Sequence, residues 1–204
     1  MRVAVNALAA ERGGRAVFAD LSFVAEPGTL LRVSGANGAG KTTLLRILAG
    51  LGAAAAGGVT WQRNGADISG AEAACFVGHA NAFNEALTVR ENLEYAAALA
   101  GVAPGTDGIA SALTALGVKS LINRRFGTLS QGQCKRCSLA RLLLDPQRGR
   151  RAWLLDEPFV ALDVDTQAQL ATIISAELAA GGLVIYTSHQ SVDIAAANVQ
   201  EVSL

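Results

Sequence analysis

The segment Gly35-Ala36-Asn37-Gly38-Ala39-Gly40-Lys41-Thr42 decides the fold, because it satisfies the pattern G-x-x-x-x-G-K-[ST] at every fixed position. An apolar strand, 29–34, precedes it, and a helix with apolar residues on one face follows from Lys41 to Ala49. Glycines let successive N–H groups turn toward phosphate oxygens, and the start of the helix adds partial positive charge. The segment therefore predicts a phosphate-binding loop in which Lys41 reaches the phosphates and Thr42 ligates Mg²⁺.

Strand and helix patterns alternate around this loop. Breaks at 11–14 and 26–28 divide the first 35 residues into short strands that suit hairpins. Helices are expected between about 87 and 117, where Thr88 is the cap and Gly101 and Gly117 are stops. The remaining expected elements are strands 59–62 and 75–77, helix 131–144, strand 152–156, helix 165–180, strand 183–187 and a short helix after 189.

This order predicts an α/β protein of the P-loop NTPase kind, with a mostly parallel core sheet. We expect an N-terminal antiparallel β subdomain and a helical insert at 80–130. No linker or repeat divides the chain, so residues 1–204 are interpreted as one domain whose helical subdomain spans roughly 80–145.

Composition narrows the class of protein. Lys+Arg and Asp+Glu both total 17, so the net charge is zero and no basic stripe indicates nucleic acid. Hydrophobic residues make up 51% of the 204, which excludes a disordered or collagen-like chain. No apolar run reaches the roughly 18 residues of a membrane-spanning helix. Asn6 interrupts any signal-like core, so we expect a cytosolic-type globular chain without a cleaved targeting segment.

Two carboxylates, Asp156 and Glu157, follow the apolar strand that ends at Leu155. Ligands of open α/β sheets bind at the carboxyl ends of strands, next to the phosphate loop. Adjacent side chains on a strand point to opposite sides, so the two acids should do different work. Asp156 is expected to hold the metal, directly or through water, and Glu157 to polarise the attacking water. Alone, such a pair is more typical of a solvated turn; beside a phosphate loop, the catalytic interpretation is favoured.

The segment Leu129-Ser130-Gln131-Gly132-Gln133 resembles the signature of the ATP-binding cassette (ABC) ATPases, which is Leu-Ser-Gly-Gly-Gln or a close variant. Further family elements follow in order: 161–163 looks like the D-loop, and His189, after the strand 183–187, looks like the switch histidine. Several weaker features, among them 76–79, Gln131 and Gln190, resemble the ATP-binding subunits of the haem exporters of cytochrome c maturation.

The resemblance implies a homodimer in which each ATP lies between the phosphate loop of one protomer and the signature of the other. Integral membrane transporter subunits would be the partners, at the cytoplasmic face of the inner membrane, with haem export or haem-chaperone release as the work done. Glu157 and His189 would be catalytic, and Thr42, Asp156 and Asn81 would face Mg²⁺. The residues expected to bind ATP are Gly35, Ala36, Asn37, Gly38, Ala39, Gly40, Lys41, Thr42, Thr43, Arg12, Ser130, Gln131, Gly132, Gln133 and Asp163.

The chain departs from the family pattern at two places. Arg12 stands where an aromatic residue usually stacks on adenine; a guanidinium can stack on a base, but a solvated loop arginine is an equal alternative. Phe18, the nearest aromatic residue, is interpreted as core. The Q-loop glutamine is replaced by Ala80, and the neighbouring Asn81 either supplies the missing amide or is only a turn residue.

The sequence also allows functions other than haem export. Cys134 and Cys137 form a lone C-x-x-C, which is interpreted as a helix face rather than a metal or redox site because no second pair exists. An ABC ATPase for another exporter, of drugs or lipids, is the main alternative. A non-transport ABC protein acting on DNA or ribosomes is less favoured, because too few residues separate Lys41 from Ser130 for a coiled-coil arm.

Overall fold

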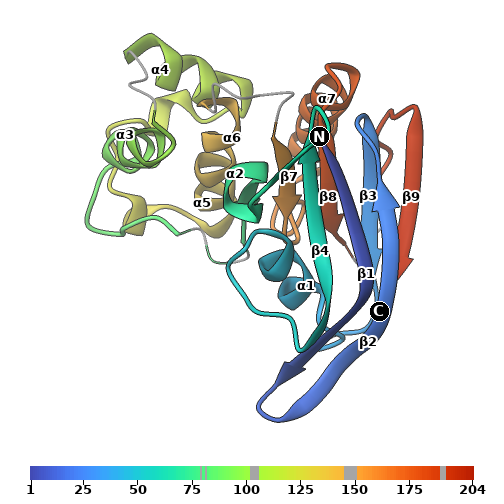
Figure 1. Ribbon diagram of the computed structural model, residues 1–204. Helices are drawn as coiled ribbons and strands as arrows, with labels where there is room; N and C mark the ends of the chain where they lie inside the picture. Colours follow the sequence, from blue (N-terminus) through green and yellow to red (C-terminus); the bar gives the residue numbers. More distant parts are fainter. Residues whose placement is uncertain (79, 81, 102–105, 145–150, 189–191) are drawn as a thin grey trace.

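The computed structural model describes residues 1–78, 80, 82–101, 106–144, 151–188 and 192–204. Within these residues the chain forms an antiparallel sheet with the strand order β2-β1-β4-β5 and a parallel sheet with the order β6-β7-β8-β3-β9. Figure 1 shows helices α3 to α6 gathered to one side of the two sheets. The predicted α/β fold, with its antiparallel N-terminal part and its helical part, is confirmed.

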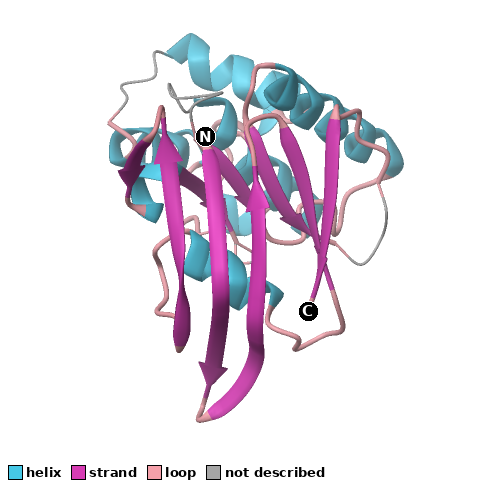
Figure 2. Cartoon of the chain, turned by 45° about the vertical axis from the view of Figure 1, so that its right-hand side comes forward, coloured by secondary structure: helices cyan, strands magenta, loops and turns pink. Residues whose placement is uncertain are grey.

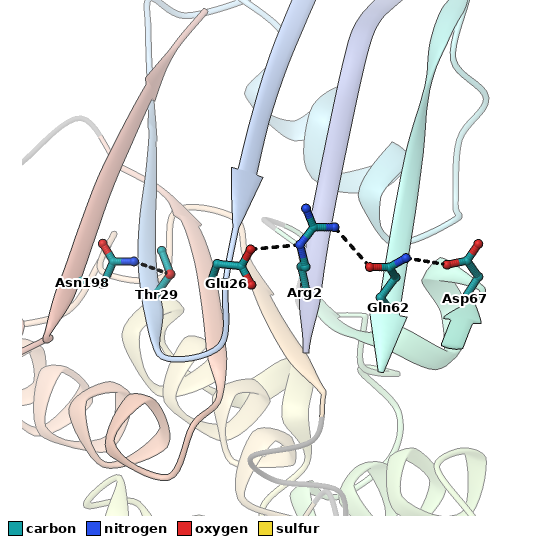
Figure 3. A network of polar contacts seen from close by, with 6 residues as sticks. All are labelled: Arg2, Glu26, Thr29, Gln62, Asp67 and Asn198. Carbon is teal, nitrogen blue, oxygen red and sulfur yellow. Dashed lines mark hydrogen bonds and ion pairs between the residues drawn. The ribbon is translucent and has the colours of Figure 1, made fainter. Parts of the chain in front are cut away.

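The antiparallel sheet is built mainly from the N-terminal hairpin, whose turn at Gly13 and Gly14 has positive φ angles of 59° and 73°. Its strands are β1 (Arg2–Arg12), β2 (Arg15–Ala25), β4 (Ala56–Arg63) and β5 (Ala66–Ile68), and the short helix α2 (Gly70–Ala73) follows. A line of polar contacts crosses one end of this sheet (Figure 3). It runs from Glu26 through Arg2 and Gln62 to Asp67, with separations of 2.9, 3.2 and 3.0 Å.

Two central strands of the parallel sheet, 152–155 and 183–187, are buried along their whole length, as expected for strands covered from two sides. The strands of this sheet are β3 (Thr29–Ser34), β6 (Ala74–Val77), β7 (Ala152–Leu155), β8 (Leu183–Thr187) and β9 (Asn198–Ser203). Side chains alternate along β7: Leu154 packs with the antiparallel sheet, and Trp153 packs toward the helical part. Helix α1 (Lys41–Leu48) packs in the same hydrophobic core as Leu154, together with strands of both sheets. The phosphate loop therefore lies between a largely buried strand and a helix that packs in the core.

The helical part and the long helix α7 cover the other face of the parallel sheet (Figure 2). Its elements are α3 (Val89–Leu99), α4 (Thr106–Ala115), the 3₁₀ turns η1 (Lys119–Leu121) and η2 (Phe126–Thr128), α5 (Gln131–Leu139) and α6 (Arg141–Leu144). Helix α7 spans Val164–Ala179. Thr88 caps α3, as predicted, through a reciprocal pair of hydrogen bonds with Glu91.

The structure corrects two expectations about secondary structure. The helix predicted over 131–144 is divided at Ala140, where the chain tightens into a turn closed by the Leu143 N–H and the Ala140 carbonyl at 3.1 Å. The short helix predicted after 189 is absent from 192–197, which form a loop leading into strand β9. β9 pairs in parallel with β3 along its whole length, so the sheet's backbone groups rather than an apolar pattern stabilise this strand.

Candidate functional site

The phosphate loop is held by its own lysine. The Lys41 ammonium donates to the carbonyl oxygens of Gly35 and Ala36 at 2.7 and 3.1 Å, across the mouth of the turn. Gly40 has a φ of 102°, and a Cβ there would lie 2.4 Å from the Val17 side chain, so no larger residue fits. An added Cβ on Gly38 meets nothing within 4 Å, but the φ of 85° there is also in the region that favours glycine. Glycines at 38 and 40 therefore let the loop take its conformation.

The acid that ends β7 lies directly against the phosphate loop. The hydroxyl of Thr42 donates to one oxygen of Asp156 at 2.7 Å, although 114 positions separate the two residues. The hydroxyl of Thr187, at the end of neighbouring β8, donates to the other oxygen at 2.8 Å. Asp156 is only 2% exposed, and its backbone N–H donates to the Val77 carbonyl of β6. The two hydroxyls thus fix the carboxylate from α1 and β8, and the contact with β6 fixes the backbone of the same residue.

Glu157, the next residue, has a different environment. Its φ of 48° is in the left-handed region, which non-glycine residues rarely adopt, and its N–H donates to the Thr187 hydroxyl at 2.8 Å. Glu157 lines two cavities, one at the phosphate loop and one beside the D-loop. The different environments of the two acids fit the prediction that they do different work.

A cavity of about 180 Å³ brings together six of the nine loop residues expected at the phosphates, and Gly35, Ala36 and Ala39 do not line it. It is lined by Arg12, Val17, Asn37, Gly38, Gly40, Lys41, Thr42, Thr43, Asp156 and Glu157. A buried carboxylate joined to a hydroxyl supplies the hard oxygen ligands that Mg²⁺ prefers, so this set fits a magnesium ion. Lysine, backbone N–H groups and the start of α1 fit a phosphate chain.

The signature segment has its own local structure, away from the lining of that cavity. Ser130 caps α5: its hydroxyl accepts from the Gln133 N–H at 3.3 Å, and the Gln133 side chain accepts from the Ser130 N–H at 3.0 Å. A Cβ on Gly132 would lie 2.6 Å from the Ala161 carbonyl, so glycine lets α5 approach the D-loop. Ser130 and Gln131 are exposed.

Asp163 begins α7 next to this segment. Its side chain accepts from the Thr166 N–H at 2.8 Å, and the hydrogen bonds from Thr166 lower the pKa of the Asp163 carboxyl. A second cavity of about 350 Å³ lies on this side, between Glu157 and the D-loop, and is lined by Glu157, Phe159, Val160, Ala161, Leu162, Gln167 and Ser188. Five of the predicted ATP contacts, Ser130, Gln131, Gly132, Gln133 and Asp163, therefore do not line the phosphate cavity of their own chain.

The structure places the remaining predicted residues as follows. Arg12 is exposed at the rim of the phosphate cavity, and Phe18 packs against the core shared by the two sheets, as predicted. Ala80 is exposed. Asn81 and His189 lie outside the described residues.

Two residues of the site were missed by sequence reasoning. Thr187 bonds both acids, and its position at the end of the strand beside β7 was an available signal. Lys135 of α5 donates to the Asp156 carbonyl at 3.2 Å, and nothing in its polar sequence surroundings indicated burial.

Comparison with known proteins agrees with this geometry. The sequence pattern of the ABC transporter family matches residues 18–160, so the chain belongs to that family. It is 44% identical to the cytochrome c biogenesis ATP-binding export protein CcmA of Albidiferax ferrireducens, over 97% of this chain and 94% of the relative. The CcmA protein of Aromatoleum aromaticum is also 44% identical, over 92% and 88%. The predicted resemblance to the ATP-binding subunits of cytochrome c maturation is confirmed.

Solved structures show the same fold. A putative ABC transporter ATP-binding protein from Pyrococcus furiosus superimposes with a TM-score of 0.82 at 25% identity, over 98% of this chain and 97% of the other. A bacterial Atm1-family ABC exporter with ATP bound shares the fold, with a TM-score of 0.78 over 93% of this chain and 34% of the exporter. The chain is thus an ATP-hydrolysing subunit of a transporter, as predicted. Within the part of the chain that is described, no helix is long and apolar enough to cross a bilayer.

Proposed function

We propose that the chain powers haem export, or the release of a haem-loaded chaperone, in the biogenesis of c-type cytochromes. The support is the near full-length similarity to proteins named as cytochrome c biogenesis ATP-binding export proteins. The observation that carries the ATPase chemistry is the hydrogen bond from Thr42 to the buried Asp156, which joins the phosphate loop to the acid pair.

Each residue of the site has a distinct task in this proposal. The loop 35–43 binds the phosphates of ATP, and Arg12 lies nearest the base. Thr42 and Asp156 would hold Mg²⁺, which would neutralise phosphate charge when bound; Asn81 either adds its amide to this set or is only a turn residue. Glu157 takes a proton from the attacking water, and His189 contacts the γ-phosphate.

The working unit is a homodimer. The exposed signature residues Ser130 and Gln131 do not line the phosphate cavity of their own chain, so they are available to an ATP held by a second copy. ATP then binds the closed dimer better than the open one, and hydrolysis removes that difference. Membrane transporter subunits hold the dimer peripherally at the cytoplasmic face of the inner membrane.

Glu157→Gln tests the ATPase chemistry. The amide keeps the shape of the side chain but is no base, so ATP hydrolysis should fall roughly 100-fold or more. ATP should then hold the variant as a dimer in size-exclusion chromatography with light scattering. The exposed Glu94 on α3 offers the matched control Glu94→Gln, which should hydrolyse ATP like wild type. Near-normal turnover in Glu157→Gln would remove Glu157 from the mechanism.

Purification of the chain in detergent from the membranes of its own organism tests which transporter it belongs to, and therefore which cargo it serves. Co-purification of cytochrome c maturation subunits, with ATP-dependent release of a haem-loaded chaperone, is the expected result. Co-purification with a lone drug or lipid permease would instead assign the chain to another exporter.

A further inference from the structure

The peptide unit between Asp156 and Glu157 is held at both of its polar ends by side chains. Its carbonyl oxygen accepts from the Lys135 ammonium at 3.2 Å, and its N–H donates to the Thr187 hydroxyl at 2.8 Å. Lys135 belongs to α5 of the helical part, whereas Thr187 ends β8 of the parallel sheet. Two separate parts of the molecule therefore fix the plane of one peptide.

That peptide needs to be held. Glu157 follows it with a φ of 48°, and a non-glycine residue in this region is strained, so it persists only where the surrounding structure imposes it. Rotation of the peptide plane would relax the strain and swing the Glu157 side chain away from the phosphate cavity that it lines. The direction of the general base thus depends on the two hydrogen bonds of the preceding peptide.

Lys135 is an unusual donor for this task because it is only 6% exposed. Burial lowers the pKa of its ammonium, and nearby Arg141 lowers it further, while the charges of Asp156 and Glu157 oppose both effects. Removing a charge from water is costly, and the hydrogen bond to the Asp156 carbonyl offsets part of that cost. Arg141 donates in the same way to the Phe76 carbonyl of β6, one strand along.

Lys135 also belongs to the helix that begins with the signature. Ser130 caps α5 five positions earlier, and Gly132 packs closely on the D-loop carbonyl of Ala161. A displacement of α5 would therefore move the ammonium that holds the Asp156 carbonyl. The same short helix contacts the acid pair and presents the exposed signature serine.

We propose that Lys135 is a positioning residue that holds the Asp156–Glu157 peptide and so aims Glu157 at the bound phosphates. This rests on the proposed role of Glu157 as the general base. When the signature helix contacts the ATP of a second copy, Lys135 therefore couples the position of that helix to the position of the acid pair in the same chain.

Lys135→Met is the principal test, since methionine has a similar length and no donor. We expect kcat for ATP hydrolysis to fall at least tenfold, while the KM for ATP and the Kd for ATP stay within twofold of wild type. Lys135→Arg restores a cationic donor and should recover kcat to within about threefold. Lys119 is exposed in the same helical part, so Lys119→Met is the matched control and should hydrolyse ATP normally.

A double-variant cycle separates this inference from the proposed function. If Glu157→Gln alone leaves hydrolysis intact, the proposed role of Glu157 as the general base fails. If Glu157→Gln abolishes it but Lys135→Met has the turnover of wild type, the positioning role is wrong. With Glu157 already replaced by Gln, adding Lys135→Met should lower the residual turnover less than twofold, because the group being aimed is gone.

Loss of folding would be recognised by urea unfolding and by nucleotide binding, and Lys135→Gln provides a second variant that keeps a shorter donor. If both the Met and Gln variants lose ATP affinity together with turnover, Lys135 is a core residue only and the proposal is overturned. A selective loss of kcat that Lys135→Arg reverses supports it.

Discussion

Thr187 and Asp156 form a hydrogen bond of 2.8 Å in which neither residue is open to solvent, since Thr187 is 0% and Asp156 2% exposed. The same hydroxyl accepts from the Glu157 N–H. One threonine therefore serves both acids, as an acceptor for one backbone group and a donor to one carboxylate. Because hydroxyl groups can do both at once, no apolar side chain of the same shape is an adequate replacement.

Thr187→Val should lower the free energy of unfolding by about 1–3 kcal/mol, because it leaves a buried N–H and a buried carboxylate oxygen without this partner. ATP hydrolysis should fall as well, since both acids lose a constraint. Urea unfolding and steady-state hydrolysis are the measurements. Thr172 of α7 is exposed and bonds only within its helix, so Thr172→Val should cost less than about 0.5 kcal/mol. Equal stability of the two variants would contradict the importance of the buried bond.

Local signals in the sequence predicted much of the fold. Thr88 was identified as a helix cap from its position, and the stops at Gly101 and Gly117 have φ angles of 76° and 68°. The phosphate loop and Asp156 could be placed together because parallel strands end at one edge of a sheet, and their hydrogen bond agrees with that prediction.

What the sequence did not predict depends on contacts between distant segments. Strand β9 is an edge strand in which no residue is buried, so it carries no apolar pattern, and its pairing with β3 stabilises it instead. Lys135 looks like a solvated residue between Cys134 and Arg136, and only the packing of α5 on β7 brings it to the Asp156 carbonyl. The burial of a polar residue is a tertiary property.

The cysteines of α5 give a prediction about pH. Burial raises the pKa of the Cys137 thiol from its ordinary 9.0 to about 12, and burial also raises that of half-buried Cys134. At pH 8 the thiolate fraction of Cys137 is then on the order of one in ten thousand, and only the thiolate is nucleophilic. Iodoacetamide at pH 8 should leave Cys137 unmodified in the folded protein and modify it fully in urea, as read by mass spectrometry of peptides.

The same shift has a consequence for stability. A thiol whose folded pKa lies above its unfolded value stabilises the folded state fully below pH 9, and this contribution is lost as pH rises toward 12. Between pH 9 and pH 12, the free energy of unfolding of Cys137→Ala should therefore fall less than that of wild type. Rapid alkylation of Cys137 in the folded protein at pH 8 would show that its thiol is not protected in this way.

Nucleotide selectivity follows from the exposed Arg12, which is paired in register with Arg15 across the first hairpin and lines the phosphate cavity with Val17 and Asn37. No aromatic ring is among the described residues that line this cavity, so the phosphates should supply most of the affinity. We expect the Kd values for ATP and GTP to differ by less than about tenfold, or ~1.4 kcal/mol.

Two variants make this prediction sharper. Arg12→Tyr supplies a ring for stacking, which is worth about 1–3 kcal/mol per base, and should tighten ATP binding at least fivefold. Arg12→Ala should weaken ATP and GTP binding by similar factors, whereas Arg15→Ala, the matched control on the partner strand, should leave both unchanged. Competition against a fluorescent ATP analogue measures all four proteins under one condition. An ATP preference above a hundredfold in wild type would mean that another residue recognises the base and that Arg12 does not set the selectivity.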